Sequence, residues 1–540
     1  MKKDDMSLFK FNAAAKKELL ERVISHVQLA YQNTPENIRE EVLEEMIYWE
    51  KKRLEKMRHS WWRSPRLDFW EQYQQQYVVA PREVRHRLLE QSIDHYAHQI
   101  VGNFSPWVHT LATKVVPPFL NFLLNPFSFQ KLISLRSTLI NENLIISGNI
   151  ANIKALLQRG TLVFVPTHVS NLDSILLGTA LHDCDFPPAM YGAGLNLFRN
   201  KIIGFFMNHL GAYKVDRQRV HTLYKDVLKE YATSSLEMGF HNLFFPGGTR
   251  SRSGAIEKRL KLGLLGTTLA AYVRNLIHGK RNPNLYVIPV NINCHLTLEA
   301  ETLIHDFLAV TGKSRYIIEN DEFSKPQRVY TYLKNHMNLN SKSFIHFGDP
   351  LDPFGNRVDE TGCSLDRHGR KIDISKYVMA QGEVKLDFDR DQNYTKELAT
   401  TLIDVYHRHN RVLSTNLVAF ALYEMIALRH PDFDIYRLMR SRVYHEPIEL
   451  MAFYKMLDRV VSHVRALSEQ GKIVYSQYLK SLDTQDLVSE ALKFFGSYHA
   501  RRTVYREGDR IFVGDLLLLY YYHNRLVGYN LEDELKDVSL

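Results

Sequence analysis

The chain has 540 residues, of which 45% are hydrophobic and 24% are charged. This length exceeds one ordinary core, so we expect a catalytic domain of about 200 residues with helical flanks. The 26 glycines and 18 prolines are too few to indicate a long disordered tract. The formal net charge of +9 suits an anionic lipid, a nucleic acid or an acidic carrier protein, and it does not choose among them.

The cysteines and the apolar runs limit the class of protein further. Cys184, Cys294 and Cys363 lie far apart and form no Cys-x-x-Cys pair, which argues against a zinc ribbon or a disulfide framework and favours a reducing compartment. No apolar segment follows the first residues, so we expect no cleaved secretory signal. The longest apolar run, Val115 to Leu124, is too short to span a bilayer, and it is either core or an interfacial segment.

Residues 1–140 are predicted to form a helical N-terminal region. Apolar residues recur at helical spacing over Ala13 to Tyr31 and over Pro35 to Arg58. Between positions 51 and 66, lysines and arginines mix with Trp61 and Trp62. Such a mixture is typical of contact with an anionic membrane surface, and equally of a solvated helix face with packed aromatic residues.

Residues 141–350 are predicted to form an α/β domain. Short apolar runs alternate there with amphipathic stretches, and the runs are Thr161–Pro166, Ala189–Tyr191, Gly211–Val215, Asn242–Phe245 and Tyr286–Ile292. This alternation predicts a mostly buried sheet flanked by helices.

The remainder of the chain is predicted to be a connector followed by helices. Residues 351–390 are rich in glycine, proline and charge, so we expect loops that lead away from the catalytic domain. Helical spacing returns over 391–540 and predicts a C-terminal helical domain, with stretches at Leu417–Leu428, Ile448–Leu467, Leu487–Phe495 and Ile511–Tyr522. We see no internal repeat of fixed period.

A candidate catalytic pair follows the first predicted strand. The run that ends at Pro166 leads directly into Thr167-His168-Val-Ser-Asn-Leu-Asp173. Polar groups after a buried strand lie at the carboxyl edge of the sheet, where active sites are common. A histidine there can remove a proton from an attacking hydroxyl, while a carboxylate on its other nitrogen holds the tautomer.

Two other histidines have an aspartate at the same spacing. His221 and Asp226 fall in a charged segment that we expect to be an exposed helix, and His368 and Asp373 fall in the glycine-rich connector. We interpret both pairs as solvated surface residues.

Cations follow two further predicted strands. The stretch from Gly211 ends in Asp-Arg217-Gln-Arg219, and Leu243-Phe-Phe-Pro246 leads into Gly247-Gly-Thr-Arg250-Ser-Arg252-Ser-Gly254. A glycine-rich turn with adjacent arginines offers the donors of a phosphate site, and the alternative is a basic loop without a ligand. Pro289, in the last run, either shapes an acyl pocket or marks an edge strand.

The order of these four elements resembles the glycerophospholipid acyltransferase superfamily over residues 145–350. The family's blocks are a His-x-x-x-x-Asp pair, a Gly-to-Arg strand, a Phe-x-Glu-Gly-x-Arg-Ser turn and an Ile-Pro strand. The chain is most similar to the large glycerol-3-phosphate acyltransferases and their dihydroxyacetone-phosphate relatives, because of the Arg250–Gly254 run, the following Lys261-Leu-Gly263 and the long helical tail.

The resemblance implies residue roles. His168 is then the general base and Asp173 its orienting acid, and Pro289 lies at the acyl pocket. The residues implied for glycerophosphate binding are Arg217, Gly248, Arg250, Ser251 and Arg252, with Lys214, Arg219 and Lys261 as secondary candidates. One departure is Gly247, where the family carries a glutamate near the bound glycerophosphate. Its absence implies an altered acceptor, lower activity or a neighbouring carboxylate that serves instead.

The implied reaction moves a fatty acyl group from acyl-CoA or acyl carrier protein to the hydroxyl of glycerol 3-phosphate, which forms lysophosphatidate for phospholipid biosynthesis. No metal or other cofactor is expected, and the implied location is the cytoplasmic face of a membrane, peripheral or monotopic. The alternatives are dihydroxyacetone phosphate or a lysophospholipid as acceptor, or a non-catalytic, peripheral lipid-binding protein.

Other classes lack their motifs. We find no Gly-x-Ser-x-Gly elbow of a serine hydrolase and no recognisable nucleic-acid module. Gly312-Lys313-Ser314 has Phe307 where a P-loop needs glycine.

Overall fold

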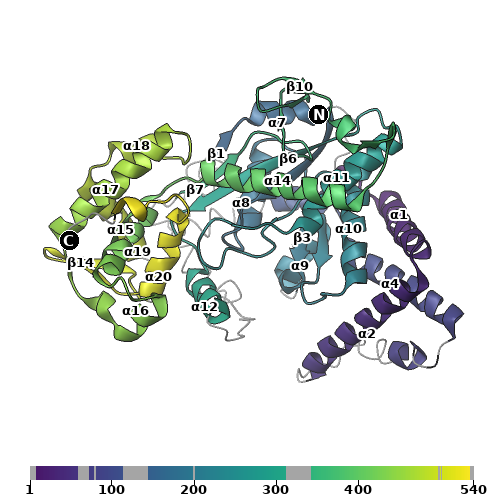
Figure 1. The fold of residues 1–540 in the computed structure, drawn as a ribbon, viewed down its shortest axis with the longest axis horizontal. Helices are drawn as coiled ribbons and strands as arrows, with labels where there is room; N and C mark the ends of the chain where they lie inside the picture. Colours follow the sequence, from purple (N-terminus) through teal and green to yellow (C-terminus); the bar gives the residue numbers. More distant parts are fainter. Residues whose placement is uncertain are drawn as a thin grey trace.

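The computed structural model describes residues 8–58, 72–77, 79, 81–113, 144–198, 201–311, 342–496, 499 and 501–535. It consists of N-terminal helices, a central sheet covered by helices, and a mainly helical C-terminal region (Figure 1). The predicted α/β class with helical flanks is therefore confirmed. Among the described residues, no helix combines the length and apolar character needed to cross a membrane. The segments 59–71, 115–124 and 312–314, considered above, lie outside the described residues.

The central sheet has seven strands in the order β1-β7-β6-β2-β5-β3-β4. All neighbouring strands are parallel except β6 and β7. The five predicted strands are confirmed, and β1 and β7 are additional. The bounds are β1 Leu144–Gly148, β2 Gly160–Pro166, β3 Met190–Gly194, β4 Ala212–Val215, β5 Asn242–Leu243, β6 Asn284–Cys294 and β7 Ser343–Phe347.

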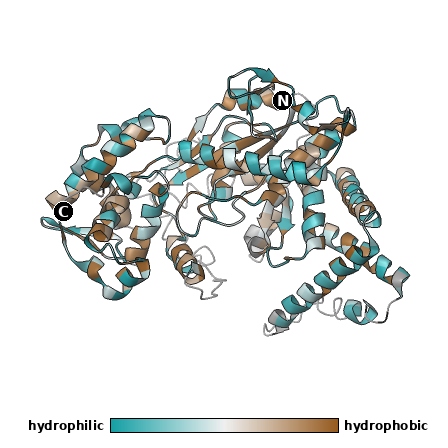
Figure 2. Ribbon diagram, in the orientation of Figure 1, coloured by the Kyte–Doolittle hydropathy of each residue, from teal (hydrophilic) through white to brown (hydrophobic). Residues whose placement is uncertain are grey.

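Helices cover both faces of the sheet. Its strands are therefore continuous apolar runs in the sequence, because side chains on both faces are buried. Phe164 of β2 joins a core with α8 (Asp173–Asp183) on one face. Its neighbours Val163 and Val165 join a second core with α11 (Leu262–Ile277) and α14 (Phe388–Arg408) on the other. Figure 2 shows the apolar strands between helices whose outer faces are hydrophilic. The other helices of this part of the chain are α7 (Ile150–Leu156), α9 (Lys201–His209) and α12 (Ala300–Thr311). Helix α12 packs into the core of the C-terminal region.

The segment predicted to lead away from the sheet instead folds back on it. The N–H of Val287 in β6 donates to the carbonyl of Leu351 at 2.7 Å, and Phe354 is buried in the core shared with α11. The segment also holds a seven-residue repeat that the sequence analysis missed. Asp352, Asp359 and Asp366 each accept the backbone N–H groups two and four residues further on. The short strands here are β8 Arg357–Val358, β9 Ser364–Leu365, β10 Lys371–Ile372, β11 Met379–Ala380 and β12 Glu383–Val384.

The C-terminal region surrounds one buried helix, α15 (Ser414–Arg429), which packs against α17 (Leu450–Glu469), α19 (Thr484–Phe495) and α20 (Leu516–His523). The predicted helix from Ile511 to Tyr522 is partly wrong, because Arg510–Val513 forms a strand, β15. The helix begins only after Asp515, whose carboxylate accepts two N–H groups of its first turn. The other elements are α16 Ile435–Ser441, β13 Ile448–Glu449, α17 Leu450–Glu469, α18 Gln477–Ser481, α19 Thr484–Phe495, β14 Val504–Glu507 and α20 Leu516–His523.

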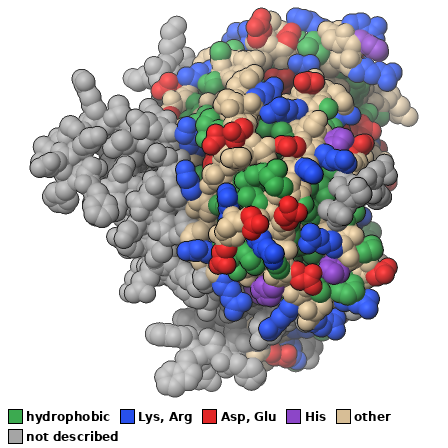
Figure 3. Space-filling model, turned by 90° about the vertical axis from the view of Figure 1, so that its left-hand side faces the viewer, with side chains coloured by type: hydrophobic (Ala, Val, Ile, Leu, Met, Phe, Trp, Pro, Cys, Tyr) green, Lys and Arg blue, Asp and Glu red, His purple; other side chains and the backbone are tan. Residues whose placement is uncertain are grey.

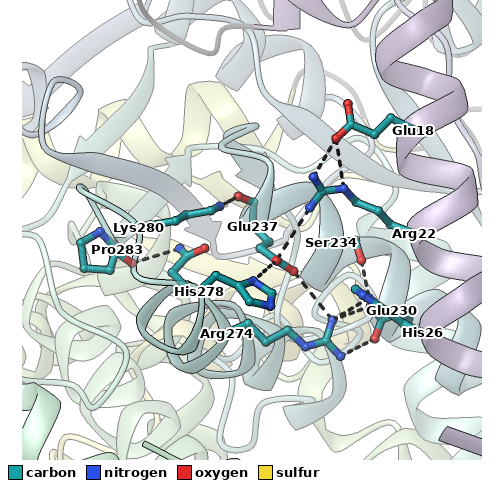
Figure 4. A network of polar contacts seen from close by, with 11 residues as sticks. Glu18, Arg22, His26, Glu230, Ser234, Glu237, Arg274, His278, Lys280 and Pro283 are labelled. Atoms are coloured by element: carbon teal, nitrogen blue, oxygen red, sulfur yellow. Dashed lines mark hydrogen bonds and ion pairs between the residues drawn. The ribbon is translucent and has the colours of Figure 1, made fainter. Parts of the chain in front are cut away.

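A polar network fastens the first N-terminal helix to the central layer. Helix α1 (Ala13–Gln32) crosses α10 (Thr222–Glu237), with α2 (Glu36–Arg58) and α4 (Arg82–Ile100) beside it. Figure 4 shows Arg22 and His26 of α1 reaching Glu237 and Glu230 of α10, at 3.8 and 2.8 Å. Arg274 of α11 also binds Glu230, at 2.8 Å. Charge therefore joins three helices at this contact.

A second, more buried cluster joins α2 to the end of β4. Glu50 is 1% exposed and binds Arg219 at 2.9 Å and Arg53 at 2.9 Å. Burial alone would raise the pKa of Glu50, but the hydrogen bond from His221 and the charges of Arg219 and Arg53 lower it to about 2. The expectation that His221 is solvated is wrong, because it is buried and its Nδ1 accepts the N–H of Tyr224 at the start of α10.

Replacing Glu50 tests this cluster. Glu50→Gln should lower the free energy of unfolding at pH 7 by about 3 to 5 kcal/mol, because it leaves buried arginines without their carboxylate. The folded-state pKa of about 2 lies below the ordinary 4.5. The stabilisation is therefore complete above pH 4.5 and is lost as the pH falls toward 2.

Urea denaturation of the wild type and the variant at pH 7 and pH 4 measures the effect. Glu55→Gln, at an exposed position of the same helix, is the control and should be neutral. Equal losses in the two variants, or a Glu50→Gln loss that does not shrink at pH 4, would contradict the role given to Glu50.

Candidate active site

His168 and Asp173 meet in the turn between β2 and α8. The Oδ2 of Asp173 accepts the Nδ1–H of His168 at 2.9 Å and the backbone N–H groups of Val169 and Ser170 at 2.6 and 2.8 Å. Asp173 is fully buried and is the first residue of α8. The spacing of five residues therefore lets a carboxylate in the first helical turn fix both the loop and the imidazole.

The ring face and the backbone of His168 are held by residues in the glycine-rich loop and next to it. The ring stacks on Phe245 with 4.0 Å between centroids. The backbone N–H donates to Glu257 Oε1 at 3.1 Å, and the carbonyl accepts the N–H of Ser251 at 2.7 Å. The side chain keeps 8% of its surface exposed, and among the described residues nothing hydrogen-bonds its Nε2.

The electrostatic surroundings keep His168 neutral near pH 7. Burial lowers its pKa below the ordinary 6.5, and the charges of Arg250 and Arg217 act in the same direction, whereas Asp173 opposes them. Since Asp173 accepts at Nδ1, the neutral ring carries its proton there. The Nε2 lone pair is then free to accept a proton from a bound hydroxyl.

Three arginines lie near this histidine. Arg250 binds Glu299 at 3.2 Å, and Arg252 binds Asp306 of α12 at 2.9 Å. Arg217 is exposed, and no carboxylate in the described part of the chain pairs with it. Partial burial of its guanidinium and the like charges of Arg250 and Arg252 lower its pKa. Such mutual repulsion marks a locally positive site that an anion would relieve.

Glu299 joins two of the sequence blocks. This buried carboxylate accepts the hydroxyl of Ser170 at 2.8 Å and the N–H of Asn171 at 3.1 Å, in addition to binding Arg250. One side chain therefore holds together the loop from Gly247 to Gly254, called the arginine loop below, and the turn from His168 to Asp173, called the histidine turn.

The secondary candidates lie in different surroundings. Lys261 is exposed, precedes α11 and donates its backbone N–H to Pro246 at 2.7 Å, which closes the loop. Lys214 lies over the ring of Phe198 at 5.8 Å. Arg219 does not join the other three arginines near His168. Its guanidinium is buried against Glu50 and Asp216 and donates to Gln99 at 2.6 Å.

Two further predicted residues shape the backbone of the site. Gly248 has φ of +75°, and a Cβ there would lie 2.9 Å from Cγ of Lys261, so this turn requires glycine. Ser251 donates its hydroxyl to the carbonyl of Ala255 at 2.6 Å. Pro289 lies in β6, between β2 and β7, so the edge-strand interpretation is wrong. Its part in an acyl pocket stays a prediction.

The C-terminal region contacts the site directly, which the sequence analysis did not foresee. Arg525 is buried and donates to Asn410 at 2.9 Å and to the carbonyl of Ile292 at 3.2 Å. Asn524 donates to the carbonyl of Ser253 in the arginine loop at 2.9 Å. The described residues contain no group of His, Cys, Asp and Glu side chains arranged to hold a metal ion.

Comparison with known proteins gives the class of this site. A family model described as Acyltransferase matches residues 148–293. The chain is 30% identical over 224 residues to glycerol-3-phosphate acyltransferase of Pseudomonas paraeruginosa, covering 41% of this chain and 24% of that protein. It is 26% identical over 208 residues to dihydroxyacetone phosphate acyltransferase of Homo sapiens, covering 37% and 28%.

The matched region spans about a quarter of the length of each of these relatives. It contains β2, the histidine turn and the arginine loop, so the similarity falls on the geometry described above. Residues 148–293 therefore form a domain that matches the acyltransferase family.

The protonation of His168 can be measured without substrate. Its imidazole should titrate below pH 6.5, because burial and the nearby arginines disfavour the charged ring. In Asp173→Asn the midpoint should fall further, because the carboxylate that favours the charged ring is gone.

Imidazole NMR signals assigned by difference from His168→Ala give both values. The signal of His368, an exposed histidine of the connector, is an internal control that should not differ between the wild type and Asp173→Asn. A His168 midpoint at or above 6.5, or a rise in Asp173→Asn, would contradict the electrostatic account.

Proposed function

We propose that the protein transfers a fatty acyl group from a thioester of coenzyme A or acyl carrier protein to the hydroxyl of glycerol 3-phosphate. The observation that carries the proposal is the neutral His168, whose Nδ1 is held by Asp173 while no described residue hydrogen-bonds its Nε2. The arginine group next to it suits a phosphate. The names of the relatives, glycerol-3-phosphate and dihydroxyacetone phosphate acyltransferase, support the same acceptor class.

In this mechanism Arg217, Arg250 and Arg252 hold the phosphate of the acceptor. Nε2 of His168 removes the proton of the primary hydroxyl as its oxygen attacks the thioester carbon. The tetrahedral oxyanion collapses, the carbon–sulfur bond breaks, and the imidazolium returns its proton to the departing thiolate. Asp173 stabilises the imidazolium in between. No metal or bound cofactor takes part in these steps, and the thioester is a co-substrate.

The acceptor has one specific competitor. Dihydroxyacetone phosphate carries the same phosphate and a primary hydroxyl, and the human relative is named for it. A lysophospholipid is a third acceptor to test, since Gly247 departs from the family pattern where the glycerophosphate binds.

We also propose that the protein associates peripherally with an anionic membrane surface. Lys51 and Lys52 are exposed near the end of α2. Trp107 and Phe205 are 67% and 42% exposed. Their two segments lie side by side, because the N–H of Ser105 donates a hydrogen bond to the carbonyl of His209. By contrast, the C-terminal face in Figure 3 mixes acidic and basic side chains, so it has no single sign of charge to attract such a surface.

The direct test measures acyl transfer from palmitoyl-CoA and from a palmitoyl acyl carrier protein. Glycerol 3-phosphate, dihydroxyacetone phosphate and lysophosphatidate are compared as acceptors. His168→Ala should lower kcat by about 10² to 10⁴ if this residue is the general base. His368→Ala removes an exposed histidine with the same spacing to an aspartate and should leave the rate unchanged.

The acceptor that gives His168-dependent product names the reaction. Flotation with vesicles containing anionic phospholipid, run alongside, tests membrane association, and a protein that stays unbound would contradict it. Vesicle binding without product from any donor and acceptor would replace the proposal with a non-catalytic lipid-binding role.

A further inference from the structure

The backbone does not require glycine at position 247. Gly248 and Gly254 have positive φ values, but Gly247 does not. A Cβ built on Gly247 would instead lie 3.1 Å from Cγ and 3.3 Å from Oε1 of Glu257, and the next nearest atom is the carbonyl oxygen of Thr249 at 3.5 Å. The side chain of Glu257 therefore occupies the volume that a side chain at 247 would enter.

Glu257 is held in this place by both ends of its segment. Ile256 is 2% exposed and packs into the core with α11. The hydrogen bond from Lys261 N–H to the carbonyl of Pro246 closes the loop, so that residue 257 returns to the side of residue 247. A segment ten residues downstream is thereby brought next to the histidine turn.

The carboxylate of Glu257 faces His168. Its Oε1 accepts the backbone N–H of His168 at 3.1 Å, while its Oε2 is buried and finds no hydrogen-bond partner among the described residues. The two other buried carboxylates here have different tasks. Asp173 binds the imidazole, and Glu299 binds Arg250 and the turn at Ser170. Glu257 therefore lies next to position 247, and its carboxylate contacts the backbone of His168, the proposed base.

We propose that Gly247 and Glu257 form a compensating pair, in which Glu257 supplies from another position the carboxylate that the family pattern carries at 247. Glu257 is a positioning residue, because its Oε1 fixes the backbone from which His168 projects. This inference rests on the proposed acyl transfer. It accounts for the departure at Gly247 without a loss of chemistry, since the acid has moved in sequence while remaining beside the histidine in space.

A relocation experiment tests the pair. Glu257→Ala should lower kcat by about 10- to 100-fold through misplacement of His168, with little change in the KM of the acceptor. Glu257→Gln keeps an oxygen acceptor for the His168 N–H and should retain most activity. Gly247→Glu alone should be impaired by crowding against Glu257. The double variant Gly247→Glu/Glu257→Ala returns a carboxylate to the same volume and should recover most of the loss.

The controls separate positioning from folding. Gly248→Ala is strained by its φ of +75°, so Glu257→Ala should not rescue it. Glu360→Ala removes an exposed glutamate and should be silent. In a His168→Ala background, Glu257→Ala should cause no further loss of rate, because it acts through that histidine. Thermal melts of each variant record any general destabilisation.

The NMR signal of the His168 imidazole provides a readout that needs no substrate. Glu257→Ala should shift it, and the double variant should return it toward the wild-type position. An unshifted signal, an unchanged kcat in Glu257→Ala, a double variant no better than the single ones, or an equal loss in the His168→Ala background would overturn the proposal. If the wild type shows no His168-dependent transfer while the signal responds as expected, the proposed reaction fails and the pairing stands.

Discussion

The carboxylate of Asp173 is the constraint on which the site depends. A single oxygen atom accepts two backbone N–H groups of the turn and the Nδ1–H of His168. Because the residue is buried, water cannot replace these bonds, and the loss of one partner would leave a charged group unsatisfied. The same oxygen thereby sets the path of the chain after β2 and the tautomer of the proposed base. Local structure and chemistry are coupled at this atom.

Distant parts of the chain support this turn. Tyr406 of α14 donates its hydroxyl to the carbonyl of Val165 in β2 at 2.7 Å. Arg525 and Asn524, which follow α20, reach β6 and the arginine loop. Gly254 lies against the backbone of Tyr521, where a Cβ would be only 2.1 Å from the carbonyl oxygen. The C-terminal region is therefore part of the wall of the site, since loop and helix touch without space for a side chain.

The N-terminal helices support the other end of the sheet. Arg219 lies only two residues after Arg217 in the segment that follows β4. Its guanidinium, however, forms ion pairs with Glu50 of α2 and with Asp216. Of these two arginines, Arg219 therefore anchors the helical flank, whereas Arg217 has no carboxylate partner among the described residues and is the one proposed to bind phosphate. Arg217 lies in the turn that begins after β4, and Arg219 follows that turn.

The sequence predicted features that depend on short spacings. The His168–Asp173 pair, the arginine loop and five of the seven strands follow from runs of fewer than about ten residues, where periodicity and turn residues decide the structure. It did not predict Glu257 beside His168, because that contact joins residues 89 positions apart. The burial of His221 likewise depends on Glu50, from a distant helix. The strand at Arg510–Val513 was read as helix because a short apolar run fits either period.

The central claim is that a neutral His168, held by Asp173, faces a phosphate site made by arginines. A crystal structure with bound glycerol 3-phosphate tests it most directly. The account predicts phosphate oxygens within hydrogen-bond distance of Arg217 and at least one of Arg250 and Arg252, with the primary hydroxyl within about 3 Å of His168 Nε2. A phosphate bound away from these arginines, or a hydroxyl directed away from Nε2, would contradict it.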